Sequence, residues 1–418
     1  MEKKRYIFIT DSINMVGGIQ FWLVGKTKYL ESQGWDVYVL FSDIGKHQHA
    51  VVTSLDKYLD GQIPGLALPP CVYPKPMRER ILIKMKKIVA SKGDSDETII
   101  ETHSPVGALW AEPFAERLNG KHVMFICNEK YHGPGTWYDP FIEFFDFKHR
   151  RKELAGEVNG EIQKLFADYK TVSPEQDYIF LLDDDPVHEV INERVEALTR
   201  KDWNICYIGR PNKSYVPNVL EGVTNFSKSH TDKEIHFIIV GDCSEIRAKI
   251  DDLMSPLNNV TITELGNVVP IPKSLFTKTD VVIAGSGSAR CAVYAGVPTI
   301  LANPDTNLAS GLLGYDIHGD YIFCKTEIEG SFDKHLERVF VDKIQEKESF
   351  DFIPKQGPDV CTIQNLQLIS ESIQKKEYYP SELLFNKKYI NLRAIFKLYC
   401  NHFLTKYFPS LKKVLKSI

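Results

Sequence analysis

The sequence has no run of about 18 apolar residues, the length that a membrane-spanning helix requires. The apolar stretch near its start, in residues 1–12, is too short for a secretory signal peptide. None of the eight cysteines forms a C-x-x-C pair, and no His/Cys cluster has the spacing of a zinc site. Several cysteines lie within apolar runs, so we expect buried, reduced thiols. These absences favour a cytoplasmic protein.

Three nucleotide-binding and hydrolase motifs are also absent. There is no G-x-G-x-x-G fingerprint of a dinucleotide site and no G-x-S-x-G elbow of a serine hydrolase, and the loop at 285–290 is not a P-loop because no Gly-Lys-Ser/Thr follows it. The net charge of −4 gives no overall basic signal for nucleic acid.

What is present indicates two α/β domains. A chain of 418 residues exceeds the size of one ordinary core. In the first half we expect strands at 5–10, 36–41, 98–101, 122–127 and 169–172, and helices at 20–33, 107–118 and 160–169. In the second half we expect strands at 204–209, 234–241, 259–266, 280–285 and 297–303, and helices at 216–229 and 289–295.

This order predicts two Rossmann-like, doubly wound domains that face a cleft, followed by a C-terminal helical tail. The predicted boundaries are 1–172 for an acceptor-side domain, 173–203 for a linker, 204–376 for a donor-binding domain and 377–418 for the tail. Ligands should bind at the carboxyl ends of the strands.

The segment from Gly285 to Arg290 connects a buried strand to a helix. Gly287 permits a close approach of the backbone, Ser286 and Ser288 add hydroxyl donors, and the helix N-terminus offers unpaired N–H groups. This pattern favours a diphosphate cradle. The alternative is an ordinary tight turn with a serine cap.

A second candidate loop follows another strand and carries two cations, Arg210 and Lys213, after Gly209. Arginine can bind phosphate in a bidentate manner and lysine supplies a point charge, so the pair could neutralise a leaving diphosphate. An ordinary solvated loop is an equal alternative.

The first half offers weaker candidates. Gly17 and Gly18 follow the first strand and could approach a donor phosphate or an acceptor. His103, Glu129 and His132 follow later strands, and His or Glu can take a proton from a sugar hydroxyl. For each of these three, a packed polar residue is the favoured alternative.

The tail from 383 to 418 contains no Asp or Glu but eight Lys or Arg. Aromatic and aliphatic residues recur there at helical spacing, which predicts a basic amphipathic helix. Such a helix could lie on an anionic membrane, which would give the protein a peripheral position on the inner face of the plasma membrane. Packing across both domains is an equal alternative.

Over most of residues 5–315 the chain resembles family 4 glycosyltransferases, which have the GT-B fold. The resemblance rests on Gly17-Gly18 before a helix, Tyr207-Ile208-Gly209-Arg210 with Lys213, Ile239-Val240-Gly241-Asp242 and Ala295-Gly296-Val297-Pro298. It implies that Arg210 and Lys213 bind the donor phosphates, that Gly266, Asn267 and Val268 border the base, and that Ser286, Gly287 and Ser288 border the diphosphate. The loop at 285–290 resembles a capsular or exopolysaccharide branch of the family.

The sequence departs from the family at two important points. Ile283 and Cys291 stand where the family has two glutamates, the second of which holds the donor ribose. Asn128 stands near the position of the family's acceptor-side histidine, so Glu129 and His132 are the candidates to replace it.

The resemblance implies transfer of a sugar from a nucleoside diphosphate donor to a glycan or lipid-linked acceptor in bacterial surface polysaccharide synthesis. It also implies retention at the anomeric carbon and no bound metal or other cofactor. Two alternatives stay open: a sugar-nucleotide epimerase of similar fold, and a non-catalytic binding or scaffold protein.

Overall fold

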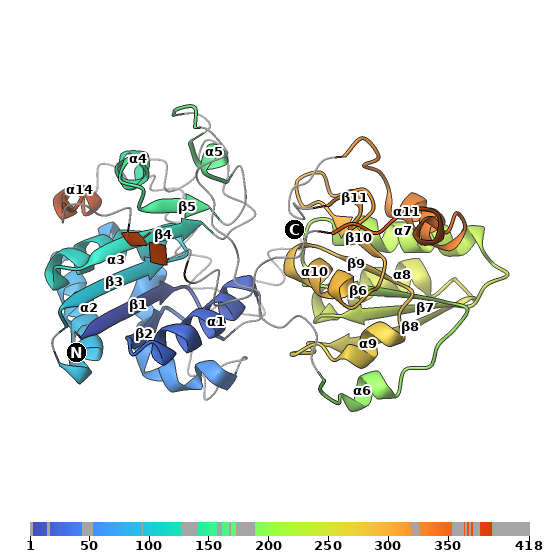
Figure 1. Ribbon diagram of the computed structural model, residues 1–418, viewed down its shortest axis with the longest axis horizontal. Coiled ribbons are helices and arrows are strands. Elements are labelled where there is room, and N and C mark those ends of the chain that lie inside the picture. The colour runs from blue at the N-terminus through green and yellow to red at the C-terminus, as the bar shows by residue number, and fades with distance from the viewer. Residues whose placement is uncertain are drawn as a thin grey trace. The chain divides into compact units, whose positions relative to one another are not determined.

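A computed structural model describes residues 3–14, 17–43, 53–93, 95–126, 141–156, 161–166, 169–172, 189–318, 326–352, 363, 366–367, 369–370 and 377–386. The chain divides into two compact units, each with its own sheet (Figure 1). Unit 1 comprises residues 1–184 and 356–418, and unit 2 comprises residues 185–355.

Unit 1 is built on a parallel five-stranded sheet with the order β2-β1-β3-β4-β5. The strands are β1 (Lys4–Thr10), β2 (Asp36–Phe41), β3 (Glu97–Thr102), β4 (Lys121–Ile126) and β5 (Leu154–Gly156). The chain passes from β1 outward to β2 and then returns to the other side of β1 at β3. The strand order therefore reverses between β1 and β3, the position at which open α/β sheets bind ligands.

Helices cover both faces of this sheet because successive strand residues alternate between two cores. Phe8 faces the core that contains Trp22 of α1 (Gly18–Ser32). Ile9 faces the opposite core, which contains Ile81 of α2 (Lys75–Val89) and Trp110 of α3 (Pro105–Leu118). Unit 1 also contains α4 (Ile142–Arg150) and α5 (Glu161–Phe166).

Unit 2 has a six-stranded sheet with the order β11-β10-β9-β6-β7-β8. The strands are β6 (Trp203–Ile208), β7 (Ile235–Val240), β8 (Val260–Gly266), β9 (Val281–Ala284), β10 (Thr299–Ala302) and β11 (Ala309–Leu312). Only β11 is antiparallel to its neighbour. Strand β6 lies between β7 and β9, so the order reverses between β6 and β9.

Both faces of the second sheet are also covered. One core joins the sheet to α7 (Val216–Ser229), α8 (Arg247–Met254) and α11 (Phe332–Phe340). The other joins it to α9 (Lys273–Thr277) and α10 (Ser286–Tyr294). The short helix α6 (Glu193–Glu196) begins at Asn192, whose side chain caps it. Each unit is thus a Rossmann-like, doubly wound domain, as predicted.

The predicted strand at 169–172 is wrong. The N–H groups of Tyr169 and Lys170 donate to the carbonyl of Phe166, so this segment ends α5 with a turn. The strand beyond β4 is instead β5, which the sequence reading missed. It also missed α2, although Ile81, Leu82, Met85 and Val89 recur at helical spacing.

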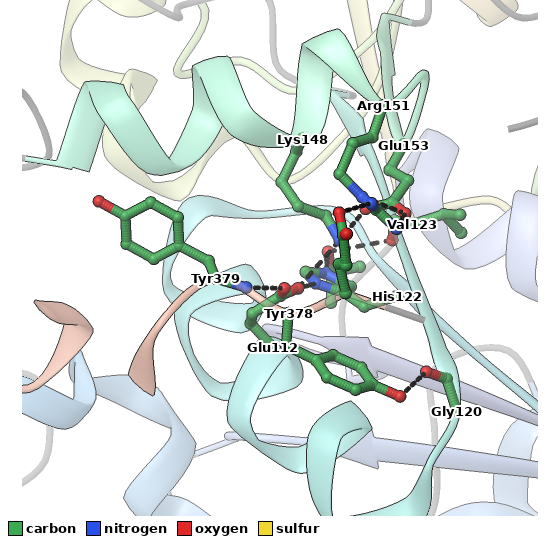
Figure 2. A network of polar contacts seen from close by, with 11 residues as sticks. Glu112, Gly120, His122, Val123, Lys148, Arg151, Glu153, Tyr378 and Tyr379 are labelled. Atoms are coloured by element: carbon green, nitrogen blue, oxygen red, sulfur yellow. Dashed lines mark hydrogen bonds and ion pairs between the residues drawn. The ribbon is translucent and has the colours of Figure 1, made fainter. Parts of the chain in front are cut away.

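Residues 377–386, within the predicted tail, belong to unit 1 and include α14 (Ser381–Leu384). Tyr378 donates its hydroxyl to the carbonyl of Gly120 at 2.8 Å (Figure 2). The predicted amphipathic helix over 387–418 lies outside the described residues. The predicted linker 173–203 is described only from residue 189 onward, so its extent stays a prediction.

Candidate functional site

The loop after β6 brings the two predicted cations to the reversal point of unit 2. Tyr207 donates its hydroxyl to the carbonyl of Arg210 at 3.1 Å, and the N–H of Lys213 donates to the same carbonyl at 3.2 Å. These bonds close the loop into a turn. The Arg210 side chain is exposed and Lys213 is half-buried.

A neighbouring glycine makes this loop possible. Gly241 follows β7 with a φ of 147°, and a Cβ there would lie 2.2 Å from the carbonyl oxygen of Gly209. No side chain fits at that distance, so the close approach of the two loops requires glycine at 241.

The loop after β9 has the backbone features of an anion site. Gly285 is the N-cap of α10, and no side chain caps this helix. Ser286 has a φ of 54°, a conformation that costs a non-glycine residue on the order of 1–3 kcal/mol and often occurs at functional sites. A Cβ added to Gly287 would meet nothing within 4 Å. The helix therefore presents uncapped N–H groups and open space at its positive end.

The two loops leave the sheet next to each other. In the pairing of β6 with β9, Ile208 is the register partner of Ala284. Gly209 and Gly285 are the next residues along each strand, at the same edge of the sheet. The fold thus brings together Arg210, Lys213 and the N-terminal end of α10, which the sequence separates by more than 70 residues.

A pocket of about 380 Å³ opens beside these loops, at the carboxyl ends of β7 and β8. Gly266 and Asn267, predicted to border a base, both line it, and Gly266 has a φ of 68°. The other lining residues are Arg194, Gly241, Asp242, Cys243, Ser244, Arg247 and Glu264. Val268 is buried in the adjacent core, with 5% of its surface exposed.

The sequence reading missed the charged wall of this pocket. Arg194 donates to the carbonyl of Leu265 at 2.7 Å and to that of Glu264 at 3.1 Å, so it joins α6 to the end of β8. Arg247 forms an ion pair with the Glu264 carboxylate. These residues belong to three separate segments, and no motif links them.

Two buried residues of unit 2 limit the chemistry that the site can perform. Burial raises the pKa of the Cys243 thiol to about 12, with Glu264 and Asp242 adding to the effect. Cys243 is therefore a neutral thiol near pH 7 and no nucleophile. Arg290, predicted to bind the donor, is 6% exposed on α10. The rest of the Arg290 surface is covered by protein, whereas the Arg210 side chain is exposed.

The candidates of unit 1 lie at its own reversal point. Gly17 is the N-cap of α1, after β1, and a Cβ added to Gly18 would meet nothing within 4 Å. His103 directly follows β3. The fold thus places the glycine pair and His103 at the ends of adjacent strands. Glu129 and His132, together with Asn128, lie outside the described residues.

His103 is 2% exposed and belongs to a buried charged cluster. Its Nε2 lies 2.8 Å from the carboxylate of Glu101, which also pairs with Lys26 at 2.6 Å. Trp22 and Tyr6 donate two further hydrogen bonds to the same carboxylate. The Lys26 ammonium lies about 5 Å from the ring centroids of these two aromatic residues.

Burial alone would raise the pKa of Glu101, but Lys26 and His103 outweigh it and lower the pKa to about 2. The carboxylate therefore stays charged and holds His103 in one orientation. Sequence reasoning identified His103 but not Glu101 or Lys26. The signal was available, because Lys26 lies on the apolar face of a helix and Glu101 lies in a buried strand.

At the positions of the family's two glutamates, Ile283 is buried within β9 and Cys291 lies on α10. Neither side chain is acidic, so any hydrogen bond to a donor ribose must come from another residue. Among the described residues, no helix has the length and apolar character needed to cross a membrane.

Comparison with known proteins finds likeness in structure alone. No family model matches the chain, and no curated protein matches it in sequence. A glycosyltransferase from Rickettsia africae is similar with a TM-score of 0.59 and 17% identity, over 90% of this chain and 100% of that one. HepE from Anabaena, solved with UDP-glucose, is similar with a TM-score of 0.56 and 12% identity, over 88% and 97%.

A putative UDP-N-acetylglucosamine 2-epimerase from Listeria monocytogenes is also similar, with a TM-score of 0.50 and 13% identity, over 90% of this chain and 99% of that one. At these sequence identities the likeness shows a shared fold and does not show a shared activity. The chain therefore has the two-domain fold of GT-B glycosyltransferases and of sugar-nucleotide epimerases.

Proposed function

We propose that this protein is a glycosyltransferase that moves a sugar from a nucleoside diphosphate donor to a glycan or lipid-linked acceptor. The observation that carries the proposal is the reversal point of unit 2. There an exposed arginine, a half-buried lysine and an uncapped helix N-terminus follow adjacent strands. All three groups favour an anion with several phosphate oxygens.

In this mechanism Arg210, Lys213 and the N–H groups of α10 bind the donor diphosphate. Charge develops on that diphosphate as the bond to the sugar breaks, so these donors stabilise the transition state more than the ground state. The groups do this without a metal ion, and we expect chelators to leave turnover unchanged. Retention of the anomeric configuration, implied by the family resemblance, is part of the proposal.

The pocket at the ends of β7 and β8 is the proposed site of the base. Gly266 and Asn267 line it, and their positions next to the diphosphate loops suit a nucleoside. UDP is the first nucleotide to test, since structurally similar HepE was solved with UDP-glucose.

On the acceptor side we propose that Glu101 positions His103. The Glu101 carboxylate lies within hydrogen-bond distance of the Nε2 atom of His103, so it selects the tautomer and the orientation of the imidazole ring. Because His103 is buried, it can act as a base only if the acceptor hydroxyl reaches it inside unit 1. Glu129 and His132 stay candidates for the same role.

The epimerase is the second candidate, because a putative epimerase covers both units of the chain with the same fold. An epimerase would convert the sugar nucleotide without any acceptor. A glycosyltransferase would release the nucleoside diphosphate only when acceptor is present, apart from slow hydrolysis.

The decisive experiment has two stages. Thermal unfolding with a panel of nucleoside diphosphates and their sugars tests binding, because a ligand at about 100 times its dissociation constant adds about 2.7 kcal/mol. The donor that binds is then incubated with and without membrane-extracted acceptor, and the sugar nucleotide is followed by NMR. A changed sugar nucleotide without acceptor would favour the epimerase, and no response to any nucleotide would favour the scaffold protein.

A further inference from the structure

Helix α2 of unit 1 is strongly basic in a chain that is slightly acidic overall. Its 15 residues contain six Lys or Arg and a single carboxylate, Glu79. Glu79 is already paired with Arg117 of α3 at 2.8 Å. Arg80, Lys84, Lys86 and Lys87 are exposed. None of these four forms an ion pair with another described residue. The helix therefore presents an unneutralised positive face.

An apolar side chain lies in the middle of that face. Ile83 is 61% exposed, although the helix already buries Ile81, Leu82 and other apolar residues on its inner side. Arg80 and Lys87 are three residues before and four residues after Ile83, so they lie on the same side of the helix. Met77, nearer the helix start, is 49% exposed. Packing in the core does not account for the apolar residues at positions 77 and 83, because both side chains are exposed.

Phe385, just before the last basic stretch of the sequence, lies beside this helix. The guanidinium of Arg78 lies 4.5 Å from the ring centroid of Phe385. Beyond residue 386 the sequence contains eight Lys or Arg and no acidic residue. The sequence therefore enters its last basic stretch just after a residue that contacts α2.

A buried network fixes this attachment (Figure 2). The N–H of Tyr379 donates to Glu112 at 2.9 Å, and Glu112 pairs with Lys148 at 2.9 Å. Arg151 pairs with Glu377 at 3.1 Å. These contacts join residues 377–379, before α14, to α3 and to the end of α4, so residues 377–386 have a defined place on unit 1.

We propose that the exposed face of α2, formed by Arg80, Ile83, Lys84, Lys86 and Lys87, is a docking surface for an anionic phospholipid bilayer. Its cations match lipid phosphates, and its central isoleucine can enter the boundary between headgroups and acyl chains. The surface does not suit a second copy, because two such faces would repel each other. Nor does it offer the exposed aromatic rings on which nucleic acid bases stack. The proposal is independent of the reaction catalysed.

The test uses the full-length protein and phosphatidylcholine vesicles with and without phosphatidylglycerol. Partition is measured by co-sedimentation. The first variant combines Arg80→Gln, Lys84→Gln and Lys87→Gln, and the matched control combines Lys228→Gln, Lys334→Gln and Lys347→Gln at exposed positions of unit 2. A second variant, Ile83→Gln, tests the apolar contact without changing charge.

We expect wild type to bind the anionic vesicles more tightly than the neutral ones, and less tightly as salt is raised. Each cation near the surface contributes about fivefold, so the α2 triple variant should lose roughly 100-fold in partition while its control stays within about threefold of wild type. Ile83→Gln should lose about tenfold. Thermal midpoints should stay near wild type, because the substituted side chains are exposed.

Equal binding of wild type to anionic and neutral vesicles would overturn the proposal. An α2 triple variant that partitions as its control does would also overturn it and assign any membrane binding to the tail. Loss of a dimer in the Ile83→Gln variant, seen by light scattering, would replace the bilayer by a second copy of the chain.

Discussion

Gly287 allows the phosphate-binding proposal to be tested apart from folding. The residue lies in the first turn of α10, and a Cβ built on it meets nothing within 4 Å. Its φ lies outside the left-handed range that disfavours side chains. Gly287→Ala should therefore fold normally. Replacing glycine in a helix gains up to about 1 kcal/mol, which raises the thermal midpoint by at most about 4 °C.

Binding should change in the opposite direction. The new methyl group occupies the open space that a phosphate needs in order to reach the N–H groups of the helix. Loss of one charge-assisted hydrogen bond costs about 1.5–3 kcal/mol, which is roughly 10–150-fold in dissociation constant. Gly287→Val should weaken binding further. Calorimetric titration with UDP measures the affinity, and thermal unfolding of the free protein measures the stability.

Gly330→Ala serves as the matched control in the same unit. A Cβ at Gly330 would contact Ile328 and Lys334 at ordinary distances of 3.6 and 3.8 Å. We expect UDP to bind this variant as it binds wild type. If Gly287→Ala and Gly287→Val also bind UDP with unchanged affinity, the N-terminus of α10 is not the diphosphate site.

Three further predictions concern charge. Arg210→Ala should lower turnover by about 100-fold or more, with Arg210→Lys recovering part of it, and unchanged turnover would remove Arg210 from the mechanism. Lys26→Met should destabilise the fold by about 3–5 kcal/mol in denaturant unfolding, because it leaves Glu101 charged and buried. The double variant with Glu101→Gln should recover part of the lost stability. If the stability losses of the two single variants simply add in the double variant, the pairing of Lys26 with Glu101 is contradicted. Burial and Lys148 lower the pKa of His122 to about 4, although Glu112 acts to raise it. His122 therefore stays neutral in the folded protein, whereas in the unfolded chain it gains a proton near pH 6.5. Stability should thus fall by about 3 kcal/mol between pH 6.5 and pH 4, and a His122→Gln variant with the same slope would exclude His122 as its source.

The regular parts of the fold could be predicted from the sequence. Buried strands such as 36–41, and the helix at 216–229, have strong periodicity and clear boundaries, and the structure places both where they were expected. The helix α2 was missed although its pattern was present, because exposed Met77 and Ile83 blur the division between its apolar and charged faces. The segment at 169–172 pairs with no strand in the part of the chain that the structure describes, and it follows α5 as a turn.

The sequence by itself determined which loops could bind phosphate, because glycine, serine and cations at strand ends are local features. Tertiary structure alone decided that Gly209–Lys213 and Gly285–Arg290 follow adjacent strands, since strand order depends on long-range pairing. It also decided that His103 is buried against Glu101 and Lys26, and that Arg194 and Glu264 form one wall of a pocket. Local sequence does not determine these contacts as a set, because Lys26, Arg194 and their partners are far apart in the sequence and only the packed sheet and helices bring them within hydrogen-bond distance.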